Sequence, residues 1–327
     1  MRKIGIEYPS PGEMHFVDLG DPPRPGPTEV LIRTVYSGIT NGTERHALLG
    51  EHGWKGLFPS RHGYQHVGVI EAVGDMVKDF RVGDWVYYGR YVGHRGWHIQ
   101  DVVCADPTSN DSHLVLPLPE DVDRQMCALF GVAGVAMRGV RRFRVKGPQK
   151  VWVAGAGPIG QFAAQAARAF GAHVTVTDIN PSRLSVAEEL GADRVINVSE
   201  GGSEEALKEG GPYDCIIDSC GVESLIMDIG RMGLLAHGGV IGLLAVRSET
   251  RFYWSMLHGT EASIEVSCHY SLDDLEVLLQ FVRRGIIRVE PLISHRVPIE
   301  HAPKIYATLR DRPWELLGVI FDWSCRR

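Results

Sequence analysis

The stretch that decides the fold reads Lys150-Val-Trp-Val-Ala-Gly-Ala-Gly-Pro-Ile-Gly160 and leads on to an acidic residue, Asp178. Its pattern predicts a short apolar strand, a glycine-rich turn and an amphipathic helix over Gln161–Phe170. A second strand is predicted over His173–Thr177, directly before the acid. This order of strand, glycine turn, helix, strand and acid is typical of a dinucleotide-binding unit.

The glycines of the turn have separate physical roles. Gly155 allows the tight turn from strand to helix, Gly157 lets the backbone approach a pyrophosphate, and Gly160 lets the helix pack close to the strand. Pro158 and Ile159 lie within this turn, and the exposed N–H groups and positive dipole end of the helix that follows hold phosphates. We therefore expect these five residues to bind the cofactor.

Asp178 indicates which dinucleotide is bound. It lies 18 residues after Gly160, where a carboxylate accepts hydrogen bonds from the adenosine ribose hydroxyls. The same charge repels a 2′-phosphate, so the sequence favours NAD over NADP. Arg183 lies close enough in sequence to weaken that preference.

Length and composition limit the remaining possibilities. A chain of 327 residues with 44% hydrophobic and 23% charged residues suits two globular domains. A net charge of −6 argues against nucleic acid as a partner. Because no apolar run approaches about 18 residues and the N-terminus lacks a signal-peptide pattern, we expect no membrane partner and a cytoplasmic location.

The glycine turn falls in the middle of the chain, and the two sides of it differ. The first part is rich in proline and glycine and carries short strand patterns, which predict a compact β-rich domain. After the turn, strands alternate with helices, which predicts a doubly wound parallel sheet. We expect residues 124–269 to form the dinucleotide-binding domain, and residues 1–123 and 270–327 to form the other, discontinuous domain.

The order of the motifs along the chain carries a resemblance to a known family. Beside the glycine turn, the motifs are Ser37-Gly-Ile-Thr-Asn-Gly-Thr-Glu-Arg-His46, Gly63-Tyr-Gln-His-Val-Gly-Val-Ile-Glu-Ala-Val-Gly74, Phe80-Arg-Val-Gly-Asp-Trp-Val86, Asp218-Ser-Cys-Gly221 and Leu292-Ile-Ser-His-Arg296. Together they resemble the medium-chain dehydrogenase/reductase family, the zinc alcohol dehydrogenase superfamily. The resemblance covers nearly the whole chain and implies a GroES-like β-barrel catalytic domain, a Rossmann domain and an active site in the cleft between them.

The chain departs from the resemblance where zinc-dependent members bind their metal. Asn41 stands where they carry a cysteine, Tyr64-Gln65 replaces a His-Glu pair, and residues 129–132 offer no third ligand. Catalytic zinc needs three protein ligands from Cys, His or carboxylate. The four-cysteine structural zinc lobe is also missing from residues 89–105. We therefore expect no zinc. A different metal site built from His46, His62, His66, His94 and His98 stays open as an alternative.

The resemblance also assigns roles to the residues that remain. Thr43 takes the place of the Ser/Thr that bonds the substrate hydroxyl, and His46 that of the histidine that relays the proton. Glu44 and Tyr64 occupy the positions of the supporting acid and the zinc-binding histidine, so they are expected to be neighbours. Without zinc, alcohol oxidation needs a positioned base or hydrogen-bond donor. Tyr64, His66 or Glu44 would supply it; alternatively, Tyr64 only fills the vacated space.

Residues 93–98 replace the zinc lobe, and this polar segment is a candidate for substrate recognition. His94, Trp97 and His98 would contact a polar substrate together with Asn41, unless the segment is only a surface turn. This polarity favours a polyol or sugar-like substrate.

The leading hypothesis is thus a zinc-independent, NAD-dependent dehydrogenase acting on a secondary alcohol, similar to a zinc-lacking branch that includes bacteriochlorophyllide dehydrogenase. The alternatives are a zinc-free enoyl or quinone reductase using NAD(P)H and a non-catalytic dinucleotide-binding protein. Family analogy implies a homodimer formed through the sheet edge near Glu261–Ser267.

Overall fold

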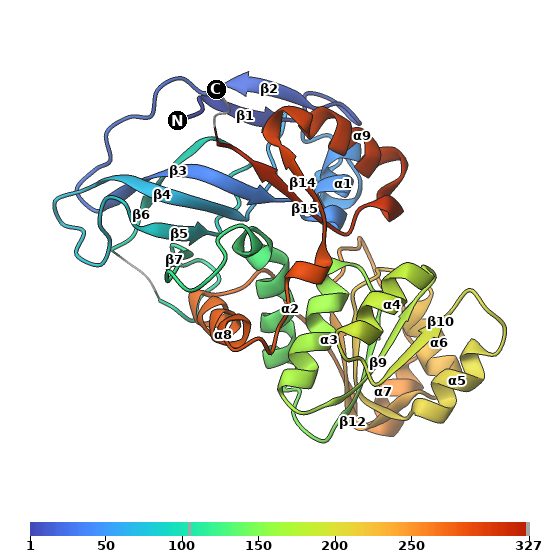
Figure 1. Cartoon of the computed structure of the whole chain (residues 1–327). Coiled ribbons are helices and arrows are strands. Elements are labelled where there is room, and N and C mark those ends of the chain that lie inside the picture. The colour runs from blue at the N-terminus through green and yellow to red at the C-terminus, as the bar shows by residue number, and fades with distance from the viewer. Residues whose placement is uncertain (104–105, 325–327) are drawn as a thin grey trace. The chain divides into compact units, whose positions relative to one another are not determined.

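The computed structural model describes residues 1–103 and 106–324, which fall into two compact units (Figure 1). The first unit comprises residues 1–131, 270–279 and the segment from Ile293 onward, and the second comprises residues 132–269 and 280–292. The division differs from the expected one at residues 124–131 and 280–292. Phe130 packs on Tyr87 in the first unit, whereas the backbone N–H and carbonyl of Arg288 both bond the Gln165 side chain in the second.

The first unit is built on a seven-stranded sheet of mainly antiparallel strands. Along the sheet the order is β14-β15-β3-β4-β5-β7, and β6 pairs with β3. These strands are β3 (Glu29–Gly38), β4 (His66–Val73), β5 (Trp85–Tyr88), β6 (Trp97–Asp101), β7 (Val115–Pro117), β14 (Ile293–Pro298) and β15 (Gly318–Asp322). Because β14 and β15 come from the end of the chain and β15 pairs with β3, the last segment completes the sheet begun by the first.

Helices and a hairpin cover this sheet. The hairpin joins β1 (Ile4–Glu7) to β2 (His15–Asp18), and the helices of this unit are α1 (Asn41–Leu49) and α9 (Ala302–Asp311). Tyr8, Leu48, Tyr306 and Trp323 belong to one buried cluster that joins these elements to β15. A second cluster, which includes Val30 and Val86, fills the sheet interior. Short 3₁₀ segments lie at His52–Trp54, Met126–Leu129, Glu290–Leu292, Ile299–His301 and Pro313–Glu315.

The second unit is a six-stranded, fully parallel sheet. Its order is β10-β9-β8-β11-β12-β13, so the chain reverses its direction of progress between β8 and β11. The strands are β8 (Lys150–Ala154), β9 (His173–Asp178), β10 (Arg194–Asn197), β11 (Tyr213–Asp218), β12 (Leu235–Leu243) and β13 (Ser263–Val266). In open α/β sheets ligands bind at the carboxyl ends of the strands beside such a reversal.

The helices of the second unit connect its parallel strands. They are α3 (Pro158–Ala169), α4 (Pro181–Glu189), α5 (Ser203–Gly210), α6 (Leu225–Met232) and α7 (Trp254–Thr260). Two further helices, α2 (Phe130–Arg142) and α8 (Leu272–Arg283), begin in the first unit and end in the second. The predicted fold class, a GroES-like domain with a doubly wound parallel-sheet domain, is confirmed. None of the helices in residues 1–103 and 106–324 has the length and apolarity that crossing a bilayer requires.

Candidate active site

The glycine turn lies at the carboxyl end of β8, in the middle of the parallel sheet. Gly155 has φ +101°, a conformation that favours glycine, and its N–H bonds the Thr177 carbonyl at 2.8 Å. A Cβ added at Gly160 would lie 1.8 Å from the Gly155 carbonyl oxygen, so only glycine lets α3 begin this close to the strand. Sequence and structure therefore agree on why these two positions are glycine.

Gly157 differs from both, because the space beside it is open. An added Cβ there would meet no atom within 4 Å, and its φ of −69° is accessible to any residue. Gly157 is also the N-cap of α3, and no side chain caps that helix end. The N–H groups of Ile159 and Gly160, in the first helical turn, can therefore donate hydrogen bonds to a bound ligand. Pro158, at the first position of the helix, has no N–H group.

Asp178 ends β9 next to the turn. One carboxylate oxygen accepts the Ala156 N–H at 2.7 Å, and the other accepts the Asn180 N–H at 2.8 Å. Each oxygen keeps a further lone pair, so the half-buried carboxylate can also accept a hydroxyl donor. Arg183 lies nearby, in the first turn of α4, and its backbone N–H donates a hydrogen bond to the Asn180 side-chain oxygen.

The loop after β11 forms the other side of the strand reversal. Ser219 donates its hydroxyl to the carbonyls of Ala154 and Gly155, at 2.9 and 3.0 Å. Asp218, fully buried, accepts the N–H groups of Cys220 and Gly221 and pairs with Arg247, which follows β12. The glycine turn is thus fixed from both neighbouring strands, and this arrangement fits a dinucleotide at the carboxyl edge.

Two substitutions separate the structural and binding roles of these glycines. Gly160→Ala should lower the free energy of unfolding by about 3 kcal/mol or more, because its methyl group would overlap a backbone carbonyl. Gly157→Ala should leave stability unchanged but weaken dinucleotide binding about tenfold or more, since blocking one hydrogen bond to a charged group costs about 1.5 to 3 kcal/mol. Chemical denaturation and fluorescence titration measure the two effects. Equal stability losses in both variants would contradict this assignment.

In the first unit, the most constrained candidate residue is Glu44, on the first turns of α1. Its carboxylate has no exposed surface and accepts hydrogen bonds from the Tyr306 hydroxyl at 2.5 Å and the Thr40 N–H at 2.8 Å. It also forms an ion pair with His94 Nε2 at 3.1 Å, and the Tyr8 hydroxyl lies 3.5 Å away. Burial raises the pKa of Glu44, but the His94 charge and the hydrogen bonds from His94, Tyr306 and Thr40 outweigh it and lower the pKa overall.

The sequence predicts Tyr64 as a neighbour of Glu44, and the structure adds His94, Tyr306, Tyr8 and Thr40 as partners of that carboxylate. The Tyr64 ring, almost fully buried, stacks on Tyr91 with centroids 5.6 Å apart. Its carbonyl accepts the hydroxyls of Tyr270 and Tyr87. Gly63, before Tyr64, has φ +126°, and an added Cβ would overlap His94. The sequence held no signal for the contacts of Tyr8 and Tyr306, which come from opposite ends of the chain.

The residues at the positions that the resemblance assigns to zinc ligands make hydrogen bonds within the protein. Asn41, at the cysteine position, donates its amide to the Leu316 carbonyl at 3.1 Å, and its Oδ1 has no partner within the described part of the chain. Gln65 donates to the Thr40 hydroxyl. An amide, a phenol and residues 129–132, which include no Cys, His or carboxylate, do not make the donor set that zinc prefers.

The predicted substrate residues of segment 93–98 require correction. His94 is buried on Glu44, Trp97 donates its indole N–H to the Gly20 carbonyl, and His98 lies inside the sheet against His66 and Tyr88. All three side chains are buried: Trp97 and His98 on β6, which pairs with β3, and His94 just before that strand. This burial leaves them almost no surface for a substrate.

His66, a predicted acid/base candidate, belongs to the same buried histidine cluster. Its ring centroid lies 4.4 Å from that of His98 and 5.6 Å from that of His94. Burial, followed by the charges of His94 and Arg95, lowers the pKa of His66 far below the ordinary 6.5, although the backbone carbonyls of Tyr88 and Gly93, as acceptors for the ring, partly oppose this shift. Burial and the charges of His66, Arg95 and His94 lower the pKa of His98 in the same direction.

Thr43 and His46 lie on the more open part of α1, and both are half-buried. His46 Nδ1 lies 2.7 Å from a carboxylate oxygen of Glu51, just beyond the helix. A carboxylate at Nδ1 fixes the tautomer and leaves Nε2 as the nitrogen that can take a proton.

The histidine cluster predicts how stability depends on pH. The folded-state pKa values of His66 and His98 are lowered, so below pH 6.5 the unfolded chain binds protons that the folded chain does not. Stability should therefore fall as pH drops below 6.5, each group contributing up to about 1.4 kcal/mol per pH unit. His98→Phe should reduce this slope, and replacement of the exposed His15 by Asn should not. Thermal denaturation at a series of pH values measures the slope. Identical slopes for the native protein and both variants would refute the role of the histidine cluster.

Comparison with known proteins agrees with this architecture. Residues 26–140 match the family model described as the alcohol dehydrogenase GroES-like domain, and residues 158–284 match that of the zinc-binding dehydrogenases. Human sorbitol dehydrogenase is 30% identical over 88% of this chain and 87% of its own. The L-threonine 3-dehydrogenase of Deinococcus deserti is 32% identical over 93% and 94%.

A solved structure shows the same fold at lower identity. An alcohol dehydrogenase from Escherichia coli, in complex with NADH, superposes with a TM-score of 0.84 at 22% identity, over 98% of this chain and 99% of that one. These matches define the class: a two-domain NAD(P)-dependent alcohol oxidoreductase. The chain belongs to the medium-chain, zinc-type alcohol dehydrogenase superfamily.

Proposed function

We propose that this enzyme transfers hydride between a secondary alcohol and NAD without a catalytic zinc ion. The observation that carries the proposal is the set of groups at the family's zinc positions. The Asn41 amide bonds a backbone carbonyl, and Tyr64 is stacked on another tyrosine. With no suitable donor set there, the developing charge on the substrate oxygen must be stabilised by protein groups.

The glycine turn would hold the cofactor. The open space beside Gly157 suits a pyrophosphate, with the uncapped first turn of α3 as hydrogen-bond donor. Asp178 would accept the adenosine ribose hydroxyls and disfavour a 2′-phosphate, which supports NAD as the preferred form over NADP. The nicotinamide supplies the hydride acceptor when the cofactor is bound.

The proton chemistry falls to the residues of the first unit. We assign Thr43 the hydrogen bond to the substrate hydroxyl and His46 the transfer of the proton towards solvent, with Glu51 orienting the ring. Tyr64 is our candidate for the group that exchanges the proton with the substrate oxygen. Glu44 and His66 suit this role less well, since Glu44 is held by four partners and the His66 ring lies among those of His94, His98 and Tyr88. We instead assign Glu44 the positioning of α1.

The substrate class we propose is a polyol or a sugar-like secondary alcohol. The support comes from the relatives named as sorbitol and L-threonine dehydrogenases, both of which are named for hydroxyl-bearing substrates. His94, Trp97 and His98, whose polarity favoured a polar substrate in the sequence, are buried and lend this choice no support.

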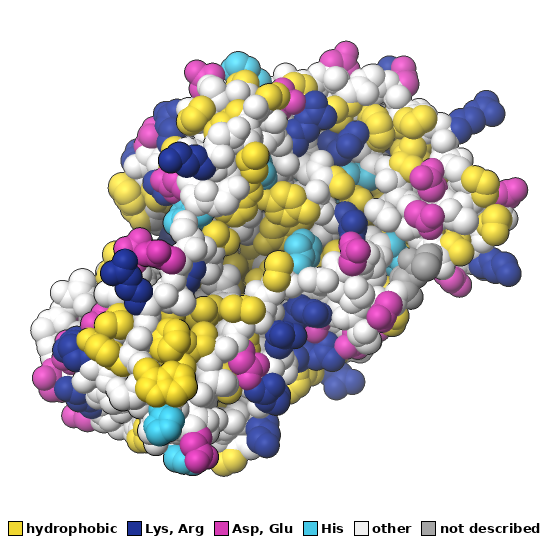
Figure 2. All heavy atoms as spheres, turned by 180° about the vertical axis from the view of Figure 1, so that it is seen from behind, with side chains coloured by type: hydrophobic (Ala, Val, Ile, Leu, Met, Phe, Trp, Pro, Cys, Tyr) yellow, Lys and Arg dark blue, Asp and Glu magenta, His cyan; other side chains and the backbone are white. Residues whose placement is uncertain are grey.

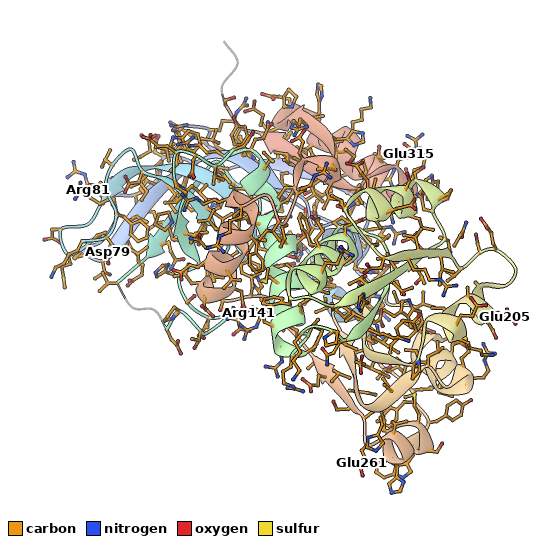
Figure 3. All side chains as sticks on the ribbon, turned by 60° about the horizontal axis from the view of Figure 1, so that its bottom comes forward. Asp79, Arg81, Arg141, Glu205, Glu261 and Glu315 are labelled. Atoms are coloured by element: carbon orange, nitrogen blue, oxygen red, sulfur yellow. The ribbon has the colours of Figure 1, made fainter. Side chains whose placement is uncertain are left out.

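We also propose a homodimer formed through the β13 edge of the parallel sheet. Apolar side chains gather on part of the surface that Figure 2 shows at the lower left. β13 ends the parallel sheet with one neighbouring strand, and exposed apolar residues lie near it in sequence. They are Phe252, Tyr253, Trp254 and Val266. Glu261, labelled in Figure 3, lies at the turn from α7 to β13. A single-chain mass by light scattering would count against the dimer.

The function is tested with protein stripped of metal by a strong chelator. Stripped enzyme should oxidise a polyol or cyclitol with NAD, and less efficiently with NADP, in a spectrophotometric screen of alcohols and sugars. Enones and quinones with NADH or NADPH serve as the control for a reductase. Turnover that is lost with the metal and restored by zinc would overturn the proposal, as would activity confined to enones.

Tyr64→Phe tests the acid/base assignment. Removing the hydroxyl should lower kcat by about 100-fold, the scale expected for a proton-transferring group, while the ring stays stacked on Tyr91. Steady-state kinetics measure it, and unchanged cofactor affinity by fluorescence titration shows that the fold is intact. Tyr88→Phe is the matched control, because Tyr88 is equally buried but bonds Gln100. If both variants keep full turnover, Tyr64 only fills space.

A further inference from the structure

A second group of metal-ligating side chains lies at the end of α1, apart from the family's zinc positions. Gly50 ends the helix in the left-handed conformation, with φ +68°. Its N–H bonds the Ala47 carbonyl, and the Glu51 N–H bonds the His46 carbonyl at 2.8 Å. This reversal folds residues 51 and 52 back beside the last turn of the helix, so that three side chains close in sequence meet on one side.

The three side chains that meet there are His46, Glu51 and His52. One ligand atom of each lies within 4.8 Å of the others. His46 Nδ1 and a Glu51 oxygen are 2.7 Å apart, and the two imidazole rings lie edge to face with centroids 4.6 Å apart. Zinc ligands lie about 2.0 to 2.2 Å from the ion, so donors within 4.8 Å of one another are close enough to share one ion once the side chains rotate.

The surroundings of this cluster favour a cation that arrives from solvent. The side chains of His46 and Glu51 are 26% and 42% exposed, and His52 is exposed. The carbonyl groups at the C-terminal end of α1 add partial negative charge. Arg45 opposes this, with its guanidinium 3.7 Å from Glu51, so only a strongly coordinating ion would displace that contact.

We propose that His46, Glu51 and His52 bind a divalent transition-metal ion, with Zn²⁺ as the best match. Two imidazoles and a carboxylate are a donor set that zinc accepts, with water in the remaining position. Alkaline-earth ions, which prefer all-oxygen ligands, do not match.

Occupation of this site also has a functional consequence, which rests on the proposed role of His46 in proton transfer. A metal-bound imidazole cannot relay a proton. Zinc at this site would therefore inhibit the enzyme, the reverse of its usual part in this superfamily.

Binding is measured directly on the chelator-treated, full-length enzyme with zinc alone, by calorimetry. The native protein should bind one equivalent. His52→Asn, in which Asn tolerates the positive φ of 52° at this position, and Glu51→Gln should each weaken binding at least about tenfold, since losing even a supporting group of a metal ligand costs that much. His237→Asn is the control, because His237 is exposed and faces a single carboxylate, that of Glu261.

Copper provides a second measurement that does not depend on turnover. The electron paramagnetic resonance spectrum of bound Cu²⁺ should show coupling to two nitrogen ligands in the native protein and to one in His52→Asn. No zinc binding, or zinc binding that the two variants leave unchanged, would overturn the site.

Kinetics separate this proposal from the proposed function. Saturating zinc should lower native turnover by up to about 100-fold, the scale of a lost proton-transfer group, and should inhibit His52→Asn far less at the same concentration. Bound zinc without inhibition would leave the site standing and overturn the relay role of His46. If metal-stripped His52→Asn instead regained activity when zinc is added, zinc independence would be overturned and the site would stand.

Discussion

The buried carboxylate of Glu44 is the constraint on which the first unit depends. A charge without exposed surface is costly unless it is paired, and removing one partner of a buried pair typically costs about 3 to 5 kcal/mol. Glu44 meets this requirement with groups from four segments: Tyr8 after the first strand, Thr40 before α1, His94 between β5 and β6, and Tyr306 on α9. The two ends of the chain are thereby fixed to α1, the helix that carries Thr43 and His46.

The partners of Glu44 include a residue that the resemblance did not suggest. His94 takes the imidazole contact to Glu44 that the sequence suggested for a neighbour at position 64. Tyr64 stacks on Tyr91, and the Asn41 amide donates a hydrogen bond to the Leu316 carbonyl. The contacts of Glu44 thus give this acid a structural role within the first unit.

The second unit shows how far local sequence could be trusted. The roles of Gly155 and Gly160 follow from sequence because each is set by backbone sterics within a few residues. The hydrogen bonds that Asp178 accepts from Ala156 and Asn180 follow less directly from the sequence. The ion pair of Asp218 with Arg247 could not be predicted, because the two residues are distant in sequence. The domain limits were also displaced, because contacts such as Gln165 with Arg288 join segments distant in sequence.

The sequence by itself determined the parallel sheet, its glycine turn, the acid that follows it and the lack of zinc ligands at the family positions, since each depends on the identity and spacing of neighbouring residues. Only the tertiary structure decided which side chains meet. It buried His94, Trp97 and His98, because segments distant in sequence cover them: His94 contacts Glu44, Trp97 contacts Gly20 and His98 contacts His66. It also gathered His46, Glu51 and His52 into one cluster, because a left-handed glycine reverses the chain at the end of α1.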